Sequence, residues 1–251
     1  LSVGHVQQAH FYTADICLVF FVTATLLFAV RFARDGDQGD LWAAAAAMGL
    51  AAGSKATGFL LVIPVAIGSI WRRPGLKQFG AAVAAAAAAF AATNPYALLE
   101  LRTFLANASG QGAIMRGAAD VPYTRQYHNS APYVYPLVQQ FRWGMGWLVG
   151  GCALAGVGRA IVRAERVERP RAEDWVLLGW VVPTFALVGG LYAKFPRYVL
   201  PMVPTLAIYA ASAVRAVEGR RPAVGRVVAA VLVGASLLRV GALAAMYRRP
   251  H

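Results

Sequence analysis

Apolar stretches separated by short polar connections recur along almost the whole chain. Most are about 15 to 20 residues long, and a helix of about 20 residues crosses the ~30 Å hydrocarbon core of a bilayer. We therefore predict an all-α, polytopic membrane bundle of about eight spans, at residues 14–32, 41–53, 56–70, 79–93, 143–162, 175–192, 198–214 and 227–246.

The stretch at 41–53 is the weakest of the eight. About 13 residues in a helix cover only ~20 Å of the hydrocarbon core. Two interpretations stay open for it, a short tilted span or the first arm of a helical hairpin. In either case, we expect residues 1–251 to form a single transmembrane domain.

The composition supports a membrane protein. Hydrophobic residues make up 59% of the 251 residues and charged residues 14%, whereas ordinary soluble domains contain roughly 25% charged residues. The formal net charge of +13 would by itself suggest a nucleic-acid-binding protein. The positions of the cations give a different explanation, so we expect no nucleic-acid partner.

Lysines and arginines gather in alternate connections of the predicted bundle. Residues 31–34, 72–77, 159–171 and 215–226 contain two, three, five and four of them, fourteen of the 24 in the chain. Lysine and arginine favour the cytoplasmic side of a membrane. The pattern predicts that these four connections lie inside and that the start of the chain lies outside.

One connection on the predicted outer face, residues 94–142, is far longer than the others. A connection of about fifty residues in a compact bundle is usually a functional loop or lid. This one mixes tyrosines and phenylalanines with arginines. Aromatic rings stack on sugar faces and guanidinium groups bind phosphate, so a sugar phosphate suits this segment. An alternative stays open, an interfacial helix plus an extended segment that only anchors the fold.

Four ionisable residues lie at predicted outer ends of the spans. Asp15 begins an apolar stretch, Lys55 separates two of them, and Lys194 and Arg197 lie in a proline-containing turn. Each has an ordinary explanation: a favourable helix dipole for Asp15, snorkelling for Lys55, and headgroup contact for the other two. Cations on the side where positive charge is disfavoured nevertheless suggest an anionic partner such as a lipid phosphate.

Other candidate groups on the outer face are scarce. The predicted topology places only Asp15, Glu100 and Asp120 among the acidic residues outside. Acid–base chemistry there must use one of these three or a group outside this chain. The four histidines are too scattered for a metal site, and Cys17 and Cys152 both lie in apolar stretches. We predict no metal site from spacing, while a divalent ion as a cofactor stays open.

Five segments in order carry a resemblance to a known family. They are HFYTAD at 10–15, GLAAGSK at 49–55, TNPYALL at 93–99, YTRQY at 123–127 and KFPRYVLP at 194–201. Together they resemble the bacterial C-type glycosyltransferases related to protein O-mannosyltransferases and aminoarabinose transferases. The resemblance implies an inverting membrane enzyme that moves a sugar from a polyprenyl-phosphate donor to an acceptor hydroxyl of a lipid, protein or glycan. It implies a multi-pass protein of the bacterial plasma membrane, with its active site on the extracytoplasmic face.

The resemblance also implies roles for individual residues. Asp15 matches the family's second acidic position and is expected to be a catalytic or orienting carboxylate. The donor phosphate is expected to bind Lys55, Lys194 and Arg197. The leaving phosphate gains negative charge during transfer. Cations already in place stabilise this charge in a water-poor pocket. The substrate pocket is expected to include His10, Tyr12, Arg125, Tyr127 and Tyr198.

The family's principal acidic motif lies in its first extracytoplasmic loop, upstream of the point where this sequence begins. The chain starts with Leu1 in a polar segment. We therefore expect it to be the downstream part of a longer protein, with the main catalytic carboxylate upstream.

A transporter or flippase of lipid-linked sugars is the alternative. Such a protein needs polar groups near the middle of the membrane, often in broken helices within paired repeats. Here the charges gather at the ends of the apolar stretches, apart from Arg239, and the sequence has no duplicated halves. These features favour the transferase.

Overall fold

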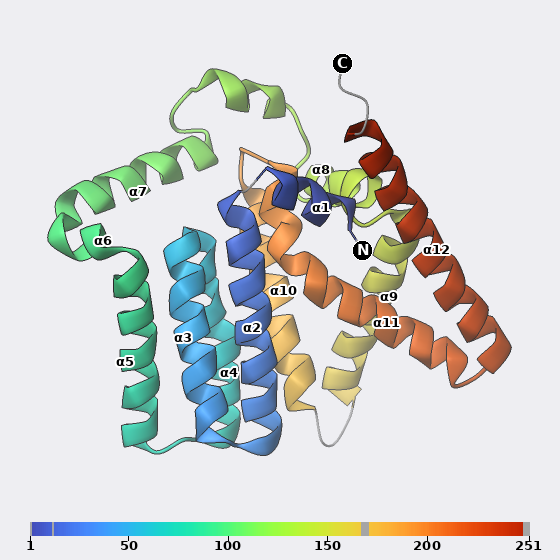
Figure 1. Ribbon diagram of the computed structural model, residues 1–251, viewed down its shortest axis with the longest axis horizontal. Coiled ribbons are helices and arrows are strands. Elements are labelled where there is room, and N and C mark those ends of the chain that lie inside the picture. The colour runs from blue at the N-terminus through green and yellow to red at the C-terminus, as the bar shows by residue number, and fades with distance from the viewer. Residues whose placement is uncertain (1, 12, 167–170, 248–251) are drawn as a thin grey trace.

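The computed structural model describes residues 2–11, 13–166 and 171–247, which form only helices, turns and loops (Figure 1). The predicted all-α class is confirmed for these residues. The α-helices are α1 (Val3–His10), α2 (Ala14–Asp35), α3 (Gln38–Ser54), α4 (Val62–Arg72), α5 (Leu76–Thr93), α6 (Pro95–Leu99), α7 (Leu101–Arg116), α8 (Val134–Gln139), α9 (Trp147–Arg166), α10 (Ala172–Gly190), α11 (Val203–Glu218) and α12 (Pro222–Tyr247). Shorter helical turns are η1 (Ala56–Leu61), η2 (Pro122–Tyr127), η3 (Gln140–Gly144) and η4 (Pro196–Met202).

Within the described residues, six helices are long and apolar enough to cross a membrane, where the sequence predicted about eight spans. They are α2, α5, Trp147–Ala164 of α9, α10, the continuous η4–α11 segment and α12. The protein is therefore a multi-pass membrane protein. The remaining two predicted spans, at 41–53 and 56–70, are helical but shorter. Helix α3 has 17 residues, and η1 continues into α4 on the other side of Lys55, running in the opposite direction (Figure 1).

The segment 94–142 is mostly helical, which corrects the prediction of a long loop. Helices α6 and α7 extend from the end of α5 along one end of the bundle, and η2, α8 and η3 follow (Figure 1). The leucines, alanines and methionine of α7 favour a helix. This helix ends where Gly117 adopts the left-handed conformation (φ 76°). Helix α7 has no buried residue, so it lies on the surface of the bundle.

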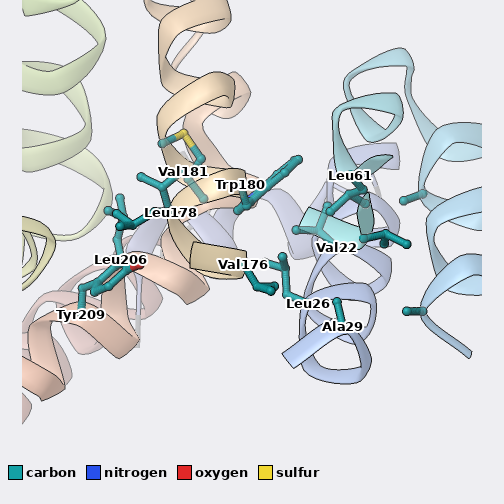
Figure 2. Close-up of a cluster of buried hydrophobic side chains, with 14 of the residues drawn as sticks. Val22, Leu26, Ala29, Leu61, Val176, Leu178, Trp180, Val181, Leu206 and Tyr209 are labelled. Atoms are coloured by element: carbon teal, nitrogen blue, oxygen red, sulfur yellow. The ribbon is translucent and has the colours of Figure 1, made fainter. Parts of the chain in front are cut away.

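The core of the bundle lies where α10 meets α2 and η1. Val176 and Trp180 of α10 point toward Val22 and Leu26 of α2 and toward Leu61 of η1, and all five side chains are buried (Figure 2). Lipid tails are as apolar as these side chains, so close van der Waals packing holds membrane helices together more than exclusion of water does. This core fixes α2 relative to η1 and α10.

Helix α5 packs on α3 through small residues. A Cβ atom on Gly49 would clash with the carbonyl oxygen of Ala86, so the two backbones approach too closely for any side chain at Gly49. Small residues allow such close contacts between membrane helices. The contact brings the end of α5 beside the end of α3.

The connections α2–α3, α4–α5 and α11–α12 lie at one end of the bundle, the lower end in Figure 1. We call this the arginine-rich end. The opposite end, which we call the Asp15 end, holds the start of α2, the end of α3 and η4. The arginine-rich end contains Arg34, Arg72, Arg73, Lys77, Arg220 and Arg221.

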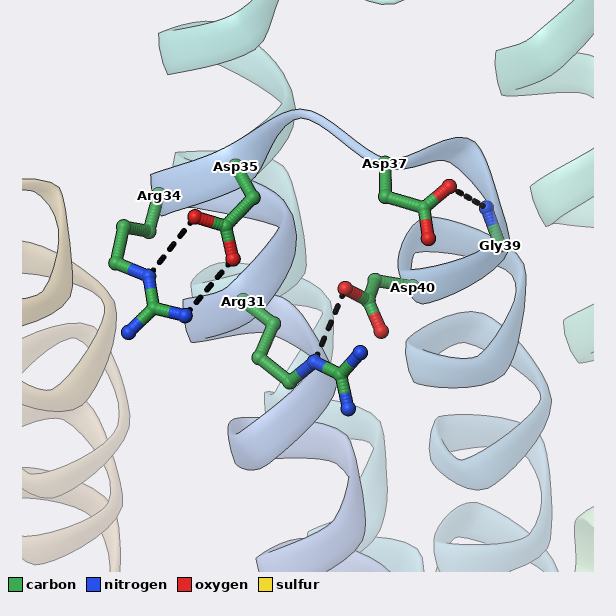
Figure 3. A network of polar contacts seen from close by, with 6 residues as sticks. All are labelled: Arg31, Arg34, Asp35, Asp37, Gly39 and Asp40. Carbon is green, nitrogen blue, oxygen red and sulfur yellow. Dashed lines mark hydrogen bonds and ion pairs between the residues drawn. The ribbon is translucent and has the colours of Figure 1, made fainter.

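The α2–α3 connection shows how the arginine-rich end is held together. Arg31 donates from Nε to Oδ2 of Asp40 at 3.2 Å, which ties the last turns of α2 to the first turn of α3 (Figure 3). Asp37 caps α3 by accepting a hydrogen bond from the backbone N–H of Gly39 at 3.1 Å (Figure 3). Both contacts join residues close in sequence, as expected for a tight turn between antiparallel helices.

Candidate active site

Asp15 lies in the first turn of the apolar helix α2. This helix begins at Ala14, directly after Thr13, whose backbone is extended. Only 4% of the residue is exposed. A buried carboxylate is costly unless charged or polar groups compensate it. The neighbours of Asp15 therefore decide what it does.

Lys55 is the first of these neighbours. Helix α3 ends at Ser54, and Lys55 follows in extended conformation before η1 begins. A Cβ atom on Gly58 would clash with the backbone of Ala51, so a glycine lets η1 fold back closely on α3. This sharp reversal directs Lys55 at α2, where its Nζ donates to Oδ1 of Asp15 at 2.6 Å.

Arg197 approaches the same carboxylate from η4. Its Nε lies 3.9 Å from Oδ2 of Asp15, and 44% of its side chain is exposed. Trp180 of α10 donates from its indole N–H to the carbonyl oxygen of Pro201 at 3.4 Å, which anchors η4 to the core. Asp15 thus lies between two cations from distant parts of the chain.

Tyr198 completes this group, which we call the Asp15 cluster: Asp15, Lys55, Arg197 and Tyr198. The Nζ atom of Lys55 lies 4.6 Å from the centre of the Tyr198 ring, within range of a cation–π interaction. The Tyr198 hydroxyl donates to Sδ of Met115 at the end of α7, at 2.9 Å. The cluster is therefore covered on one side by the segment 94–142.

An aromatic group adjoins the cluster. Phe195 packs edge-on against Tyr198 and Tyr127, with ring centres 5.4 and 5.2 Å apart. Tyr127 is buried, and burial raises the pKa of its hydroxyl to about 12. This hydroxyl stays protonated at neutral pH and can donate a hydrogen bond.

Lys194 lies apart from Arg197 although only Phe195 and Pro196 separate them. Its Nζ donates to the carbonyl oxygen of Tyr192 at 3.2 Å, and only 4% of the residue is exposed. Burial lowers the pKa of its ammonium group. Together with Arg116, Tyr127 and other residues, Lys194 lines a cavity of about 330 Å³. The turn thus directs the two expected phosphate-binding cations to different surroundings.

The remaining residues expected in the substrate pocket are less closely connected. His10 is exposed and its ring lies 4.7 Å from that of Tyr247 in α12. Arg125 forms a bidentate pair with Asp120, which raises the pKa of the arginine and lowers the pKa of the aspartate. Both side chains of this pair are about two-thirds exposed. Tyr12 lies outside the described residues.

Of the three carboxylates expected at this end, only Asp15 is buried. Glu100 is exposed, as are both members of the Asp120–Arg125 pair. Among the described residues, no three histidine, cysteine, aspartate or glutamate side chains gather in a way that would hold a metal ion.

Sequence reasoning gave no role to Asn94, Met115 or Phe195. Asn94 donates from Nδ2 to the carbonyl oxygen of Gly53 at 3.2 Å, two residues before Lys55. It thereby satisfies a carbonyl at the end of α3, which lacks a partner within the helix. Asn94 belongs to the segment 93–99 and Gly53 to the segment 49–55, and both segments carried the resemblance. The hydrogen bond between them is a structural reason for the presence of both segments.

Comparison with known families gives one match. Residues 2–99 match the family model described as dolichyl-phosphate-mannose-protein mannosyltransferase. These residues belong to that family. The mannosyltransferase-family segment runs from α1 to α6 and contains both Asp15 and Lys55, whereas Arg197 and Tyr198 lie beyond it. No curated protein and no solved structure matches the chain.

Proposed function

We propose that the protein is a membrane glycosyltransferase that takes a sugar from a polyprenyl-phosphate donor and transfers it to an acceptor hydroxyl at the Asp15 end. The observation that carries this proposal is the buried ion pair of Asp15 and Lys55, with Arg197 beside it, inside and next to the family segment. The acceptor is a lipid, a protein or a glycan, and mannose, the sugar in the description of the matching family, serves as the probe in the experiments below.

The charges of the Asp15 cluster suit a phosphate. Two cations and one carboxylate leave a net positive charge, and an ammonium group has three N–H donors, of which Lys55 uses one toward Asp15. Arg197 is partly exposed, so a donor phosphate can reach its guanidinium group. As the bond from the sugar to the phosphate breaks, negative charge grows on the phosphate oxygens, and cations held in place beforehand stabilise that charge.

Asp15 has two tasks in this proposal. Its Oδ1 holds Lys55, and its Oδ2 accepts no hydrogen bond from the residues that the structure describes. Oδ2 is therefore available to the acceptor hydroxyl. It takes the hydroxyl proton as the hydroxyl oxygen bonds to the sugar carbon, and the bond from that carbon to the phosphate oxygen breaks, so that the phosphate leaves with its electron pair. Attack opposite to the leaving phosphate inverts the configuration at that carbon. A carboxylate within hydrogen-bond reach of the hydroxyl contributes about 10²- to 10⁴-fold to such a step.

The orientation belongs to the same proposal. The preference of arginine and lysine for the cytoplasmic side supports a cytoplasmic arginine-rich end, with the Asp15 cluster on the extracytoplasmic face of a bacterial plasma membrane. Residues 94–142 then cover the cluster from outside and bring Tyr127 and Met115 to it. Polyprenyl chains lie in the bilayer beside the apolar helices, and the phosphate lies at the level of the cluster.

Substitution of Arg197 tests the proposal. We expect Arg197→Ala to raise KM for polyprenyl-phosphate-mannose by about tenfold or more, because a charge-assisted phosphate contact is lost. Arg197→Lys should have a smaller effect, since an ammonium group keeps the charge but not the planar fork. The measurement is transfer of radiolabelled mannose by the purified protein in nanodiscs.

Arg102→Ala is the matched control, because Arg102 is exposed on α7 at the same end of the bundle and is not among the residues expected in the substrate pocket. It should leave KM for the donor unchanged. If Arg197→Ala also leaves both transfer and donor affinity unchanged, Arg197 contacts only headgroups and the proposed phosphate site is wrong.

A further inference from the structure

A second pair of cations lies where α12 meets η3. Arg239 belongs to the apolar helix α12, and its Nη2 donates to the backbone carbonyl oxygen of Arg142 at 2.6 Å. Among the described residues, neither arginine pairs with a carboxylate. An arginine within a membrane helix is costly and is normally compensated by an anion or by hydrogen-bond acceptors. A single carbonyl oxygen occupies only part of the hydrogen-bonding capacity of Arg239.

The backbone next to the pair is shaped to admit a guanidinium group. Gly146 has φ +89°, and a Cβ atom there would clash with Nη1 of Arg239. Helix α9 begins one residue later, at Trp147, and its first backbone N–H groups have no acceptor within the helix. The positive end of the α9 dipole therefore adds to the two guanidinium charges. The two guanidinium groups and the helix dipole all favour an anion at this point.

The surroundings of the pair are apolar and open to the bilayer. A cavity of about 470 Å³ is lined by Arg142 and Arg239 together with Trp143, Trp147 and Leu148. Both tryptophans are more than half exposed, and exposed tryptophans are typical of the level of lipid headgroups.

The cavity continues along the helices. Met145, Val149 and Ser236 line it and also line a neighbouring cavity of about 350 Å³, so the two cavities adjoin. Helix α12 diverges from α9 in Figure 1, and Gly225 is its sole buried residue in the part of the chain that the structure describes. A hydrocarbon chain can therefore enter this groove from the side.

We propose that Arg142 and Arg239 bind the phosphate of an anionic phospholipid of the surrounding bilayer, with an acyl chain in the groove between α9 and α12. The apolar walls favour a lipid over a free phosphate ion, and the lateral opening suits a molecule that is already abundant in the membrane. None of the residues lining the two cavities belongs to the Asp15 cluster. The inference stands independently of the proposed transferase activity.

Lipid retention by the full chain tests this site. The protein is purified from mixed micelles containing equal amounts of phosphatidylglycerol and phosphatidylcholine, and the lipid that remains bound is measured by native mass spectrometry. We expect selective retention of phosphatidylglycerol, and a fall of about tenfold or more in its affinity for the variant carrying both Arg142→Gln and Arg239→Gln. Arg226→Gln, on the same helix but near the arginine-rich end, should retain phosphatidylglycerol like the unmodified protein.

A further variant separates lipid binding from general loss of charge. Gly146→Ala keeps both arginines but displaces the guanidinium group of Arg239, so it should also weaken retention of phosphatidylglycerol. Thermal unfolding of each variant checks that the protein remains folded. Equal retention of the two lipids by the unmodified protein would overturn the proposal without any variant. Retention of added undecaprenyl phosphate in place of phosphatidylglycerol would show that the proposed occupant is wrong.

Discussion

The two ends of the bundle use the same kind of ion pair in different ways. At the arginine-rich end, Asp40 in the first turn of α3 pairs with Arg31, nine residues earlier. At the other end, Asp15 in the first turn of α2 pairs with Lys55, 40 residues later, and lies beside Arg197. Both aspartates are about 5% exposed or less. The local pair closes a turn between consecutive helices, whereas the long-range cluster joins three separate elements around one carboxylate.

This difference suggests which end carries chemistry. A turn needs only neighbouring residues to hold it, and Arg31 with Asp40 meets that need. Bringing Lys55 and Arg197 together at a buried carboxylate adds little to any turn. Buried charges that serve no local purpose are typical of functional sites.

The orientation of the two ends gives an all-or-none test. In a background with Cys17 and Cys152 replaced by alanine, Ser109→Cys in α7 should react with an impermeant thiol reagent in intact cells, and Arg221→Cys should react only after lysis. Ser109 and Arg221 are both exposed, so each cysteine can react once the reagent reaches its side. Labelling of Arg221→Cys but not of Ser109→Cys in intact cells would reverse the proposed orientation.

Asn substitution compares the two buried aspartates directly. Asp15→Asn should lower turnover by about ten- to a thousandfold, equivalent to roughly 1.4 to 4 kcal/mol, with the protein still folded. The reason is that an amide neither holds Lys55 as an ion pair nor accepts a proton. Turnover is measured by mannose transfer and folding by thermal unfolding in nanodiscs.

Asp40→Asn is the matched control for this change. It should leave turnover unchanged and lower the free energy of unfolding by about 1 kcal/mol, because its partner Arg31 is half exposed. Similar turnover in the two variants would remove the functional distinction between the two ends.

A double-mutant cycle measures the coupling energy between Asp15 and Lys55. Lys55→Met and Asp15→Asn should be non-additive, with a coupling energy of about 1 to 3 kcal/mol in turnover, because each removes the same ion pair. Lys55→Met and Asp40→Asn lie at opposite ends of α3, about 22 Å apart by helix rise. Their effects should add to within about 0.5 kcal/mol. Additivity of the first pair would mean that Asp15 and Lys55 act separately.

Much of the fold follows from the apolar stretches and the positions of the arginines. All eight predicted stretches are helical, because an apolar segment in a membrane must satisfy its backbone hydrogen bonds internally. The prediction was less accurate for polar segments. Residues 94–142 fold mostly into short helices, and nothing in their apolar pattern distinguishes surface helices from a loop.

The candidate site could be predicted only in part. The topology placed Asp15, Lys55 and Arg197 at one end, but charge counting does not tell which of them touch. Their contact depends on Gly58, which lets η1 fold back on α3, and on the anchoring of η4 by Trp180. Sequence proximity was also misleading for Lys194, which lines a cavity that does not include Arg197, whereas Arg197 lies beside Asp15.

The order of synthesis means that the Asp15 cluster forms in two steps. Lys55 leaves the ribosome soon after Asp15, and α2, α3 and η1 contain all that their ion pair requires. Arg197 follows Asp15 by about 180 residues, which at about 5 to 20 residues per second means a delay of roughly 10 to 40 s. During that interval Asp15 has Lys55 as its cationic partner but lacks Arg197. In the nascent chain, Lys55 therefore compensates the charge of Asp15 early. The cluster is complete only when η4 has reached the membrane.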